Sequence, residues 1–266
     1  MTTVAGLLAV ALYLATTGYL IVASRTQPLA AGQPRAPLML WLAALLAHLG
    51  ALIPLVATET GLNLCLGNAL SASMWLVAGL LWLTALRHPL AVLGVVILPL
   101  TALATLTAVL CDGDTSYATS AGIDLHILFS ALGWAFLALS TAQAAVMTAQ
   151  HRALHNHHTA GIVRHLPPLF SMEVWLFRMI FIGWLFLGLS LLSGLVFVDD
   201  LFAQHLVHKT VLSLLAWVIF STLLVGRWRL GWRGTRALAW TTGGFVALVL
   251  AYFGSKLVLE IILGRV

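Results

Sequence analysis

The sequence predicts an all-α, polytopic membrane protein that forms a single integral-membrane helical domain over residues 1–266. Hydrophobic residues make up 61% of the chain and charged residues only 8%, and the mean hydropathy is +1.04. A soluble domain of this size cannot bury so much apolar surface, whereas a bilayer can accept it. The apolar residues also gather into separate segments of about 20 residues, the length that crosses a bilayer as a helix.

These segments predict about eight transmembrane helices. Each covers, or nearly covers, a hydrocarbon core of ~30 Å at a rise of ~1.5 Å per residue. The expected spans are residues 4–23, 37–57, 66–86, 89–110, 123–149, 174–198, 210–226 and 237–262. Proline and glycine separate most of the spans, as expected of residues that end helices.

The charged residues of the loops predict how these helices are oriented. One set of loops is basic and contains Arg25, Arg35, Arg87, Arg152, Arg164, Arg227, Arg229, Arg233 and Arg236, with Glu173 as the nearby acid. The alternate loops are acidic and contain Glu59, Asp112, Asp114, Asp124, Asp199 and Asp200, with Lys209 as the nearby base. Because cytoplasmic loops carry the excess of arginine and lysine, we expect both termini outside. The first span is expected to be a retained helix, since Arg25 follows the apolar run, whereas a signal peptide has its positive charge first.

Several functional classes are disfavoured by the sequence. The net charge of +5 does not indicate a nucleic-acid-binding protein, because the arginines lie between apolar runs and form no patch on a polar domain. The chain contains no phosphate-binding loop, nucleophile elbow or zinc-protease helix, so we expect no enzyme. A solute transporter is disfavoured because paired broken helices and buried acidic residues are not evident.

Ten histidines are the outstanding polar feature of the chain. Histidine is the usual ligand of haem iron, and it also serves as a hydrogen-bonding core residue. His126 lies near the start of the span 123–149, and Ser130 and Gly133 follow it on the same helical face. Small residues on that face allow another helix, or a flat macrocycle, to approach the backbone. The alternative is a histidine that is hydrogen-bonded to the neighbouring outer loop.

His48 lies near the middle of the second span, where a polar side chain needs a partner. It is interpreted either as a hydrogen-bonded core residue or as a deep ligand. The helical rise places it on the order of 10 Å deeper than His126, so the two are not expected to bind opposite faces of one haem. His205 and His208 lie in an outer loop on the same side as His126. Either could face a ligand held there or simply be solvated.

Two further sets of residues have open interpretations. The inner loop contains a cluster of histidines, which could bind a metal or form a solvated basic loop: His151, His155, His157, His158 and His165. Cys65 and Cys111 are equally far along the chain from the turn at His88, so antiparallel helices would bring them to a similar height. A disulfide between them is compatible with this placement, although equal height does not make the side chains face each other.

Several segments resemble the cytochrome c assembly family, the CcsA/HemX/CcmC-type haem-handling membrane proteins. Residues Leu125 to Ala135 resemble the histidine-bearing helix of that family. The other similar segments are the loop around Asn63, the helix from Lys209 to Trp217, the closing loop from Gly231 to Gly234 and the part of the last helix from Ala251 to Gly254. The segment from Pro167 to Glu173 is similar to the compact YpjD-type inner-membrane subgroup.

The resemblance implies an integral membrane haem-binding protein of the cytochrome c assembly type. Such a protein would hold or hand over non-covalently bound haem b near the periplasmic face of the bacterial inner membrane. The resemblance implies His126 as the axial ligand of the haem iron, with His48, His208 and His205 as further haem-binding candidates. Its expected partners are haem, the lipid bilayer, other membrane proteins and cytochrome maturation components.

The sequence also departs from the family pattern. The stretch from Phe197 to His208 contains no tryptophan, although family members that deliver haem have a tryptophan-rich loop there. The family's histidines expected near Val225 and near Leu263 are absent. These departures favour an alternative function, in which the chain is a non-haem scaffold or regulatory subunit of a neighbouring transporter.

Overall fold

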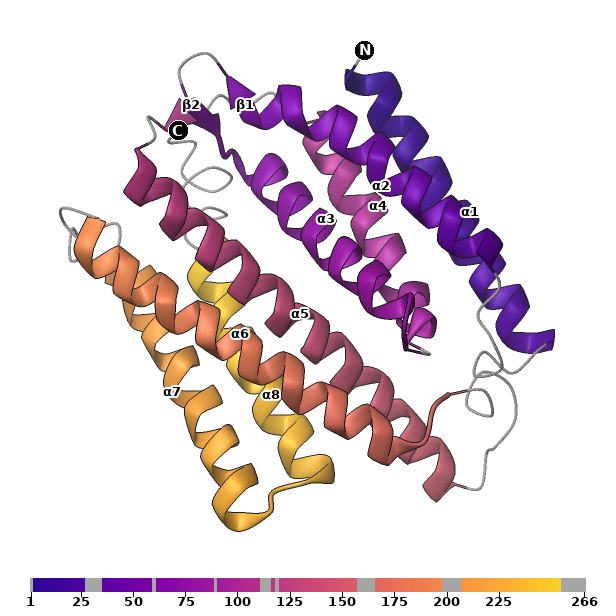
Figure 1. Cartoon of the computed structure of the whole chain (residues 1–266), viewed down its shortest axis with the longest axis vertical. Coiled ribbons are helices and arrows are strands. Elements are labelled where there is room, and N and C mark those ends of the chain that lie inside the picture. Colours follow the sequence, from indigo (N-terminus) through magenta and orange to yellow (C-terminus); the bar gives the residue numbers. More distant parts are fainter. Residues whose placement is uncertain are drawn as a thin grey trace. The chain divides into compact units, whose positions relative to one another are not determined.

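The computed structural model confirms a polytopic, all-α membrane protein (Figure 1). It describes residues 2–26, 35–58, 61–88, 90–110, 116–117, 120–156, 166–197 and 207–254. Within these ranges, eight helices are long and apolar enough to cross a membrane. They are α1 (Thr2–Thr26), α2 (Arg35–Val56), α3 (Leu66–Ala85), α4 (Gly94–Leu110) with the preceding 3-10 turn η1 (Ala91–Leu93), α5 (Ala121–His155), α6 (Leu169–Phe197), α7 (Val207–Leu230) and α8 (Gly234–Val249) with the following π-helical turn η3 (Leu250–Gly254).

Two helices, α5 and α7, exceed their expected spans by the largest margins. α5 continues past residue 149, so His151 and His155 belong to its last turns. α7 has 24 residues and extends beyond the expected span 210–226 at both ends. The reason is that hydropathy marks the hydrocarbon core, whereas a helix ends where its backbone is interrupted. At the end of α7 the interruption is Gly231, whose φ of 65° is a left-handed conformation typical of the residue after a helix.

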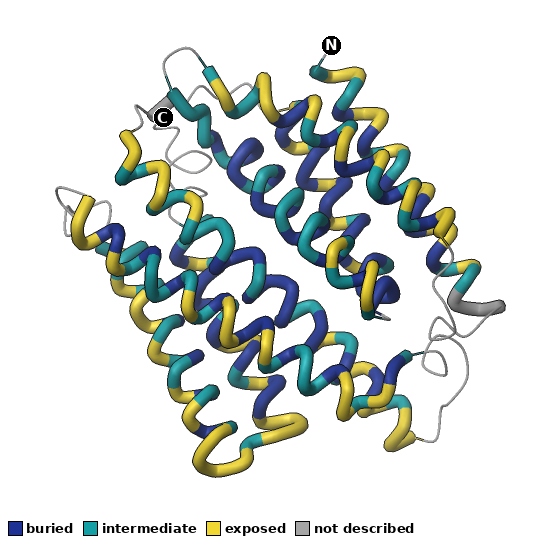
Figure 2. The backbone as a smooth tube through the Cα atoms, viewed as in Figure 1, coloured by how far each residue is buried: buried dark blue, intermediate teal, exposed yellow. Residues whose placement is uncertain are grey.

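The chain forms two compact units, and each is described by itself. The first contains Met1–Tyr117 and Val146–Met172, and the second contains Ala118–Ala145 and Glu173–Val266. The single domain expected over residues 1–266 stays a prediction. In both units the buried residues lie on helix faces that turn toward neighbouring helices, and many apolar side chains are exposed on the outer faces (Figure 2). Such an apolar exterior suits a lipid environment.

In the first unit, α1 packs against α2 and α4, and α3 packs against α2 and α4. The largest fully buried side chains here include Trp41 and Tyr13. Three short antiparallel strands pair in the order β1-β2-β3 next to the C-terminal end of α2. Their bounds are β1 (Ala57–Thr58), β2 (Gly61–Asn63) and β3 (Ser116–Tyr117). Cys65 is buried just after β2, whereas Cys111 lies outside the described residues, so the disulfide stays a prediction.

In the second unit, α7 and α8 form a helical hairpin, and η3 packs against both (Figure 1). α5 and α6 run antiparallel, with the rings of Phe136 and Phe186 stacked at a centroid distance of 6.1 Å. Glu173 at the start of α6 forms an ion pair with Arg227 near the end of α7, with 2.7 Å between Oε1 and Nη1. These two residues therefore lie at the same end of the unit, as the charge pattern predicts.

The orientation of the termini stays a prediction. We expect a reporter that is active only in the cytoplasm to be silent when fused after Val266, because the excess of arginine places the opposite helix ends inside. The same reporter inserted at residue 160, in the loop between α5 and α6, should be active. The reverse result would overturn the assigned orientation, and reporter activity at both sites would show mixed topology.

Candidate functional site

His126 lies in the second turn of α5 and contacts α6. Its Nδ1 is 2.9 Å from the Ser190 carbonyl oxygen and 3.2 Å from Ser193 Oγ. Because a carbonyl can only accept, we assign the ring proton to Nδ1, which donates to Ser190. In a neutral imidazole the other nitrogen, Nε2, then holds a lone pair. Among the described residues no hydrogen bond reaches Nε2, so this atom is available to an incoming ligand.

The Ser190 carbonyl is itself held in place by its own helix. The Ser193 hydroxyl donates to it at 2.9 Å, one turn further along α6. The ring of His126 thus meets an ordered pair of oxygen atoms, one from the backbone and one from a side chain. If His126 is a ligand, the sequence favours a carbonyl or a carboxylate of the outer loop as this acceptor. The acceptor is a carbonyl, as expected, but it comes from the body of α6.

Glycines allow α5 and α6 to approach closely enough for this contact. A Cβ added to Gly133 would lie 2.9 Å from the backbone nitrogen of Leu187. On α6, a Cβ at Gly183 would lie 2.7 Å from Cγ of Leu137. The small residues of α5 were expected to allow either a helix or a macrocycle to approach. At Gly133 the neighbour is helix α6.

Ser130 has a different role from Gly133. Its hydroxyl donates to the Ile127 carbonyl at 2.9 Å, and it also hydrogen-bonds the hydroxyl of Tyr252 in η3. This residue therefore connects α5 to the last described turn of the chain. The expected strip of small residues is used for packing between helices on two sides.

His48 lies at the centre of a polar network in the first unit. Its ring is 1% exposed and contacts one side chain from each of the other three transmembrane helices of that bundle. Nδ1 is 3.2 Å from the Tyr13 hydroxyl, Nε2 is 2.8 Å from Ser71 Oγ, and Thr105 Oγ1 is 3.3 Å from both nitrogens. The Thr105 hydroxyl donates to the Thr101 carbonyl, so it can accept from the ring. Either neutral tautomer of His48 finds a partner for both nitrogens.

The remaining candidate histidines are dispersed. His208 is exposed in the first turn of α7, and His151 and His155 are exposed at the far end of α5. His205 and the other three histidines of the inner loop, at positions 157, 158 and 165, lie outside the described residues. Among the residues that the structure does describe, no group of three or more histidine, cysteine, aspartate or glutamate side chains could hold a metal ion.

The sequence did not indicate which residues hydrogen-bond His48 and His126. For His48 the missed partners are the hydroxyl groups of Tyr13, Ser71 and Thr105. For His126 they are the backbone carbonyl of Ser190 and the hydroxyl group of Ser193. The available signal was the presence of these polar groups in spans where each needs a hydrogen-bond partner.

Comparison with known proteins identifies the family. The family model described as "Cytochrome C assembly protein" matches residues 38–263. The chain belongs to this family. The match runs from α2 to beyond η3, and so includes both His48 and His126 but not Tyr13 of α1. The resemblance inferred from the sequence is thereby confirmed.

Individual relatives agree with the family match. The chain is 31% identical to inner membrane protein YpjD of Escherichia coli (strain K12) over 210 residues, which cover 77% of this chain and 78% of the relative. It is 25% identical to protein HemX of Brevibacillus brevis over 145 residues, or 54% of this chain and 53% of the relative. It is 32% identical to cytochrome c biogenesis protein CcsA of Heterosigma akashiwo over 88 residues, or 32% and 27% of the two chains. No solved structure matches significantly.

Proposed function

We propose that this chain is a haem-binding protein of the bacterial inner membrane that acts in cytochrome c biogenesis. It would hold or hand over haem b near the periplasmic face, with His126 as the axial ligand of the iron. The observation that carries the proposal is the hydrogen bond from His126 Nδ1–H to the Ser190 carbonyl, which leaves the Nε2 lone pair available. The names of the relatives support the setting, since one is an inner membrane protein and another a cytochrome c biogenesis protein.

The surroundings of His126 suit an iron ligand. A ligating histidine commonly donates its other ring N–H to a carbonyl or carboxylate, which fixes the tautomer, orients the ring and makes the ligating nitrogen more basic. Ser190 provides that acceptor, and Ser193 helps to hold it. His126 is only partly buried, so a ligand can reach the ring from outside the helix pair. The bound haem would supply the iron chemistry, while the protein binds and orients it without covalent catalysis.

The other candidate ligands are supported to different degrees. His208 lies in the first turn of α7, and His205 precedes that helix in the sequence, both on the expected outer side. We propose one of them as the second axial ligand. For His48, the network of Tyr13, Ser71 and Thr105 supports a structural role, because both ring nitrogens already have protein partners. Apocytochromes or other maturation components are proposed as partners on family membership alone.

A non-haem scaffold or regulatory subunit remains the second candidate function. It is favoured by the absence of tryptophan between Phe197 and His208, and by the absence of the histidines that the family has near Val225 and Leu263. The partner of such a subunit would be a neighbouring membrane transporter.

A reduced-minus-oxidised absorption spectrum of the detergent-purified protein tests the proposed function. We expect a Soret band and the bands of a low-spin haem b, with the haem type checked by its pyridine complex. The spectrum should be recorded on protein as purified and after addition of haem. A well-folded protein that shows no Soret band even after haem loading would overturn the haem proposal and favour the scaffold.

A separate prediction concerns His48. The change His48→Ala removes the imidazole that hydrogen-bonds the buried hydroxyls of Tyr13 and Ser71, while Thr105 keeps its bond to the Thr101 carbonyl. It should therefore lower the free energy of unfolding by on the order of 1–3 kcal/mol. The haem spectrum of the folded fraction should stay unchanged. Thermal unfolding in detergent and haem content together measure both effects, and His155→Ala at an exposed position is the matched control. If His48→Ala leaves stability intact but changes the absorption bands, His48 is a haem ligand.

A further inference from the structure

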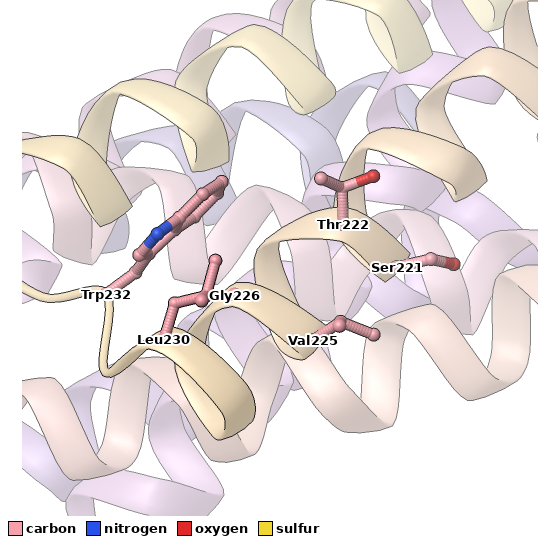
Figure 3. A pocket seen from close by; sticks show the side chains of 6 residues that line it. All are labelled: Ser221, Thr222, Val225, Gly226, Leu230 and Trp232. Atoms are coloured by element: carbon pink, nitrogen blue, oxygen red, sulfur yellow. The ribbon is translucent and has the colours of Figure 1, made fainter.

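An apolar groove runs along the last turns of α7 in the second unit. Its cavity is about 330 Å³, and its lining residues are Ser221, Thr222, Val225, Gly226, Leu230 and Trp232 (Figure 3). The hydroxyls of Ser221 and Thr222 donate to carbonyls one turn earlier in the same helix, at 2.7 and 2.9 Å. Their hydrogen atoms are therefore occupied within the helix, and the groove offers mainly an apolar surface.

Trp232 forms one wall of the groove and is firmly held. Its indole ring packs directly over Gly226, where any side chain would overlap the ring. Its backbone N–H donates to the Gly226 carbonyl at 3.1 Å, and its own carbonyl accepts from the Arg227 guanidinium at 3.3 Å. The wall is thus fixed by backbone contacts from the turn that follows α7.

The groove has about the length of one hydrocarbon chain of a lipid. Ser221 to Leu230 spans nine residue steps, or about 13 Å at the helical rise. Half of a hydrocarbon core of ~30 Å is about 15 Å, so the groove extends from near the membrane centre to one interface. It ends where the chain leaves the apolar region at Leu230 and Gly231.

The same end of the unit carries an excess of positive charge. Glu173 is 14% exposed and lies 2.7 Å from Arg227 and 3.9 Å from Nε of Arg233, whose side chain is 61% exposed. Arg229 and Arg236 are also exposed. Arg227 and Arg233 share this one carboxylate, so four guanidinium groups against one carboxylate leave the segment with a net charge of +3. The exposed side chains of Arg229, Arg233 and Arg236 can carry this excess to solvent or to lipid headgroups.

Two of these arginines are placed against tryptophan rings. The Arg229 guanidinium carbon lies 4.9 Å from the ring centroid of Trp228. The Arg236 guanidinium carbon lies 5.5 Å from the ring centroid of Trp232, the residue that forms the groove wall. One ring thus contacts both the apolar groove and a cation, so a ligand with an apolar chain and an anionic group could use both at once.

We propose that this groove and its three exposed arginines bind an anionic phospholipid. One acyl chain lies along α7 from Ser221 to Leu230, and the phosphate is held by Arg229, Arg233 and Arg236. A small free anion would gain no binding energy from the apolar groove. A neutral lipid would gain none from the excess of positive charge. Arginine is suited to phosphate because its planar fork can donate two hydrogen bonds at once. The site is independent of haem binding.

The test compares lipid binding by the full-length protein in nanodiscs of mixed phosphatidylglycerol and phosphatidylcholine. Native mass spectrometry of the released protein gives the ratio of the two lipids that stay bound. We expect phosphatidylglycerol to be preferred by roughly tenfold, since the three exposed arginines beside the groove attract an anionic headgroup. The triple variant Arg229→Gln/Arg233→Gln/Arg236→Gln should lose this preference. Val225→Trp, which fills the groove and leaves every charge, should reduce lipid retention as well.

A matched triple variant controls for general electrostatics. Arg35→Gln/Arg87→Gln/Arg152→Gln removes three exposed arginines of the first unit and changes the net charge equally. It should keep the wild-type lipid preference. The proposal is overturned if this control loses the preference to the same extent, or if Val225→Trp retains phosphatidylglycerol as the wild type does. The proposal is also overturned if the wild type shows no lipid preference and forms dimers that the Val225→Trp variant does not form. That result would instead assign the groove to a second copy of the chain.

Discussion

Replacing His126 by alanine should reduce haem retention more than any other single substitution in the chain. The change removes an imidazole whose Nδ1–H donates to a carbonyl while Nε2 has no hydrogen bond among the described residues. Loss of a mere supporting contact around a metal ligand costs about 10- to 100-fold in affinity, so loss of the ligand itself should cost at least that. Haem content per protein and the position of the absorption bands measure the effect.

Two companion variants separate ligand loss from unfolding. His155→Ala lies on the same helix, is exposed, and should leave haem content and spectrum unchanged. His126→Gly leaves a space where the ring was, and added imidazole should restore the bands if the ring acts as a ligand. If His126→Ala and His155→Ala both keep the wild-type spectrum and haem stoichiometry, the assigned ligand is wrong.

The second large effect is expected at Gly133, where α5 and α6 touch. In Gly133→Ala the new methyl group would lie 2.9 Å from the Leu187 backbone nitrogen and 3.3 Å from its Cα. Backbone atoms cannot rotate away as a side chain can, so the helices must separate. Such overpacking typically destabilises by about 1–3 kcal/mol. Because His126 and Ser190 lie on the same helix pair, separation should also lengthen their hydrogen bond and lower haem retention.

Gly243 in α8 provides the matched control for Gly133. It is exposed, and nothing lies within 4 Å of a Cβ added there. Gly243→Ala should raise stability slightly, by up to about 1 kcal/mol, because alanine favours the helix more than glycine does. The two substitutions add the same methyl group and should act with opposite sign on the unfolding temperature in detergent. Equal stability of the two variants would show that the close approach at Gly133 is not needed.

The sequence was sufficient for the membrane architecture because the physical signal there is local. An apolar run of about 20 residues has few alternatives to a membrane-spanning helix, and all eight expected spans correspond to helices. The family could also be inferred, since the segment around His126 carries the resemblance in consecutive residues. Helix ends were less predictable, as α7 shows, because polar residues such as His208 and Arg229 continue a helix outside the apolar region.

The hydrogen-bond partners of both central histidines were decided only by the tertiary structure. The Ser190 carbonyl that orients His126 is 64 residues away in the chain, and the Ser71 and Thr105 hydroxyls around His48 are 23 and 57 residues away. Helical periodicity indicates which residues share a face, but not which neighbouring helix that face contacts, nor which turns of the two helices lie side by side. For α5 and α6, the close approach at Gly133 determines the contact and its position along the helices. The sequence by itself therefore determined that His48 and His126 each need a hydrogen-bond partner. Only the packing of the helices decided that His126 keeps one ring nitrogen available, whereas both ring nitrogens of His48 have protein partners.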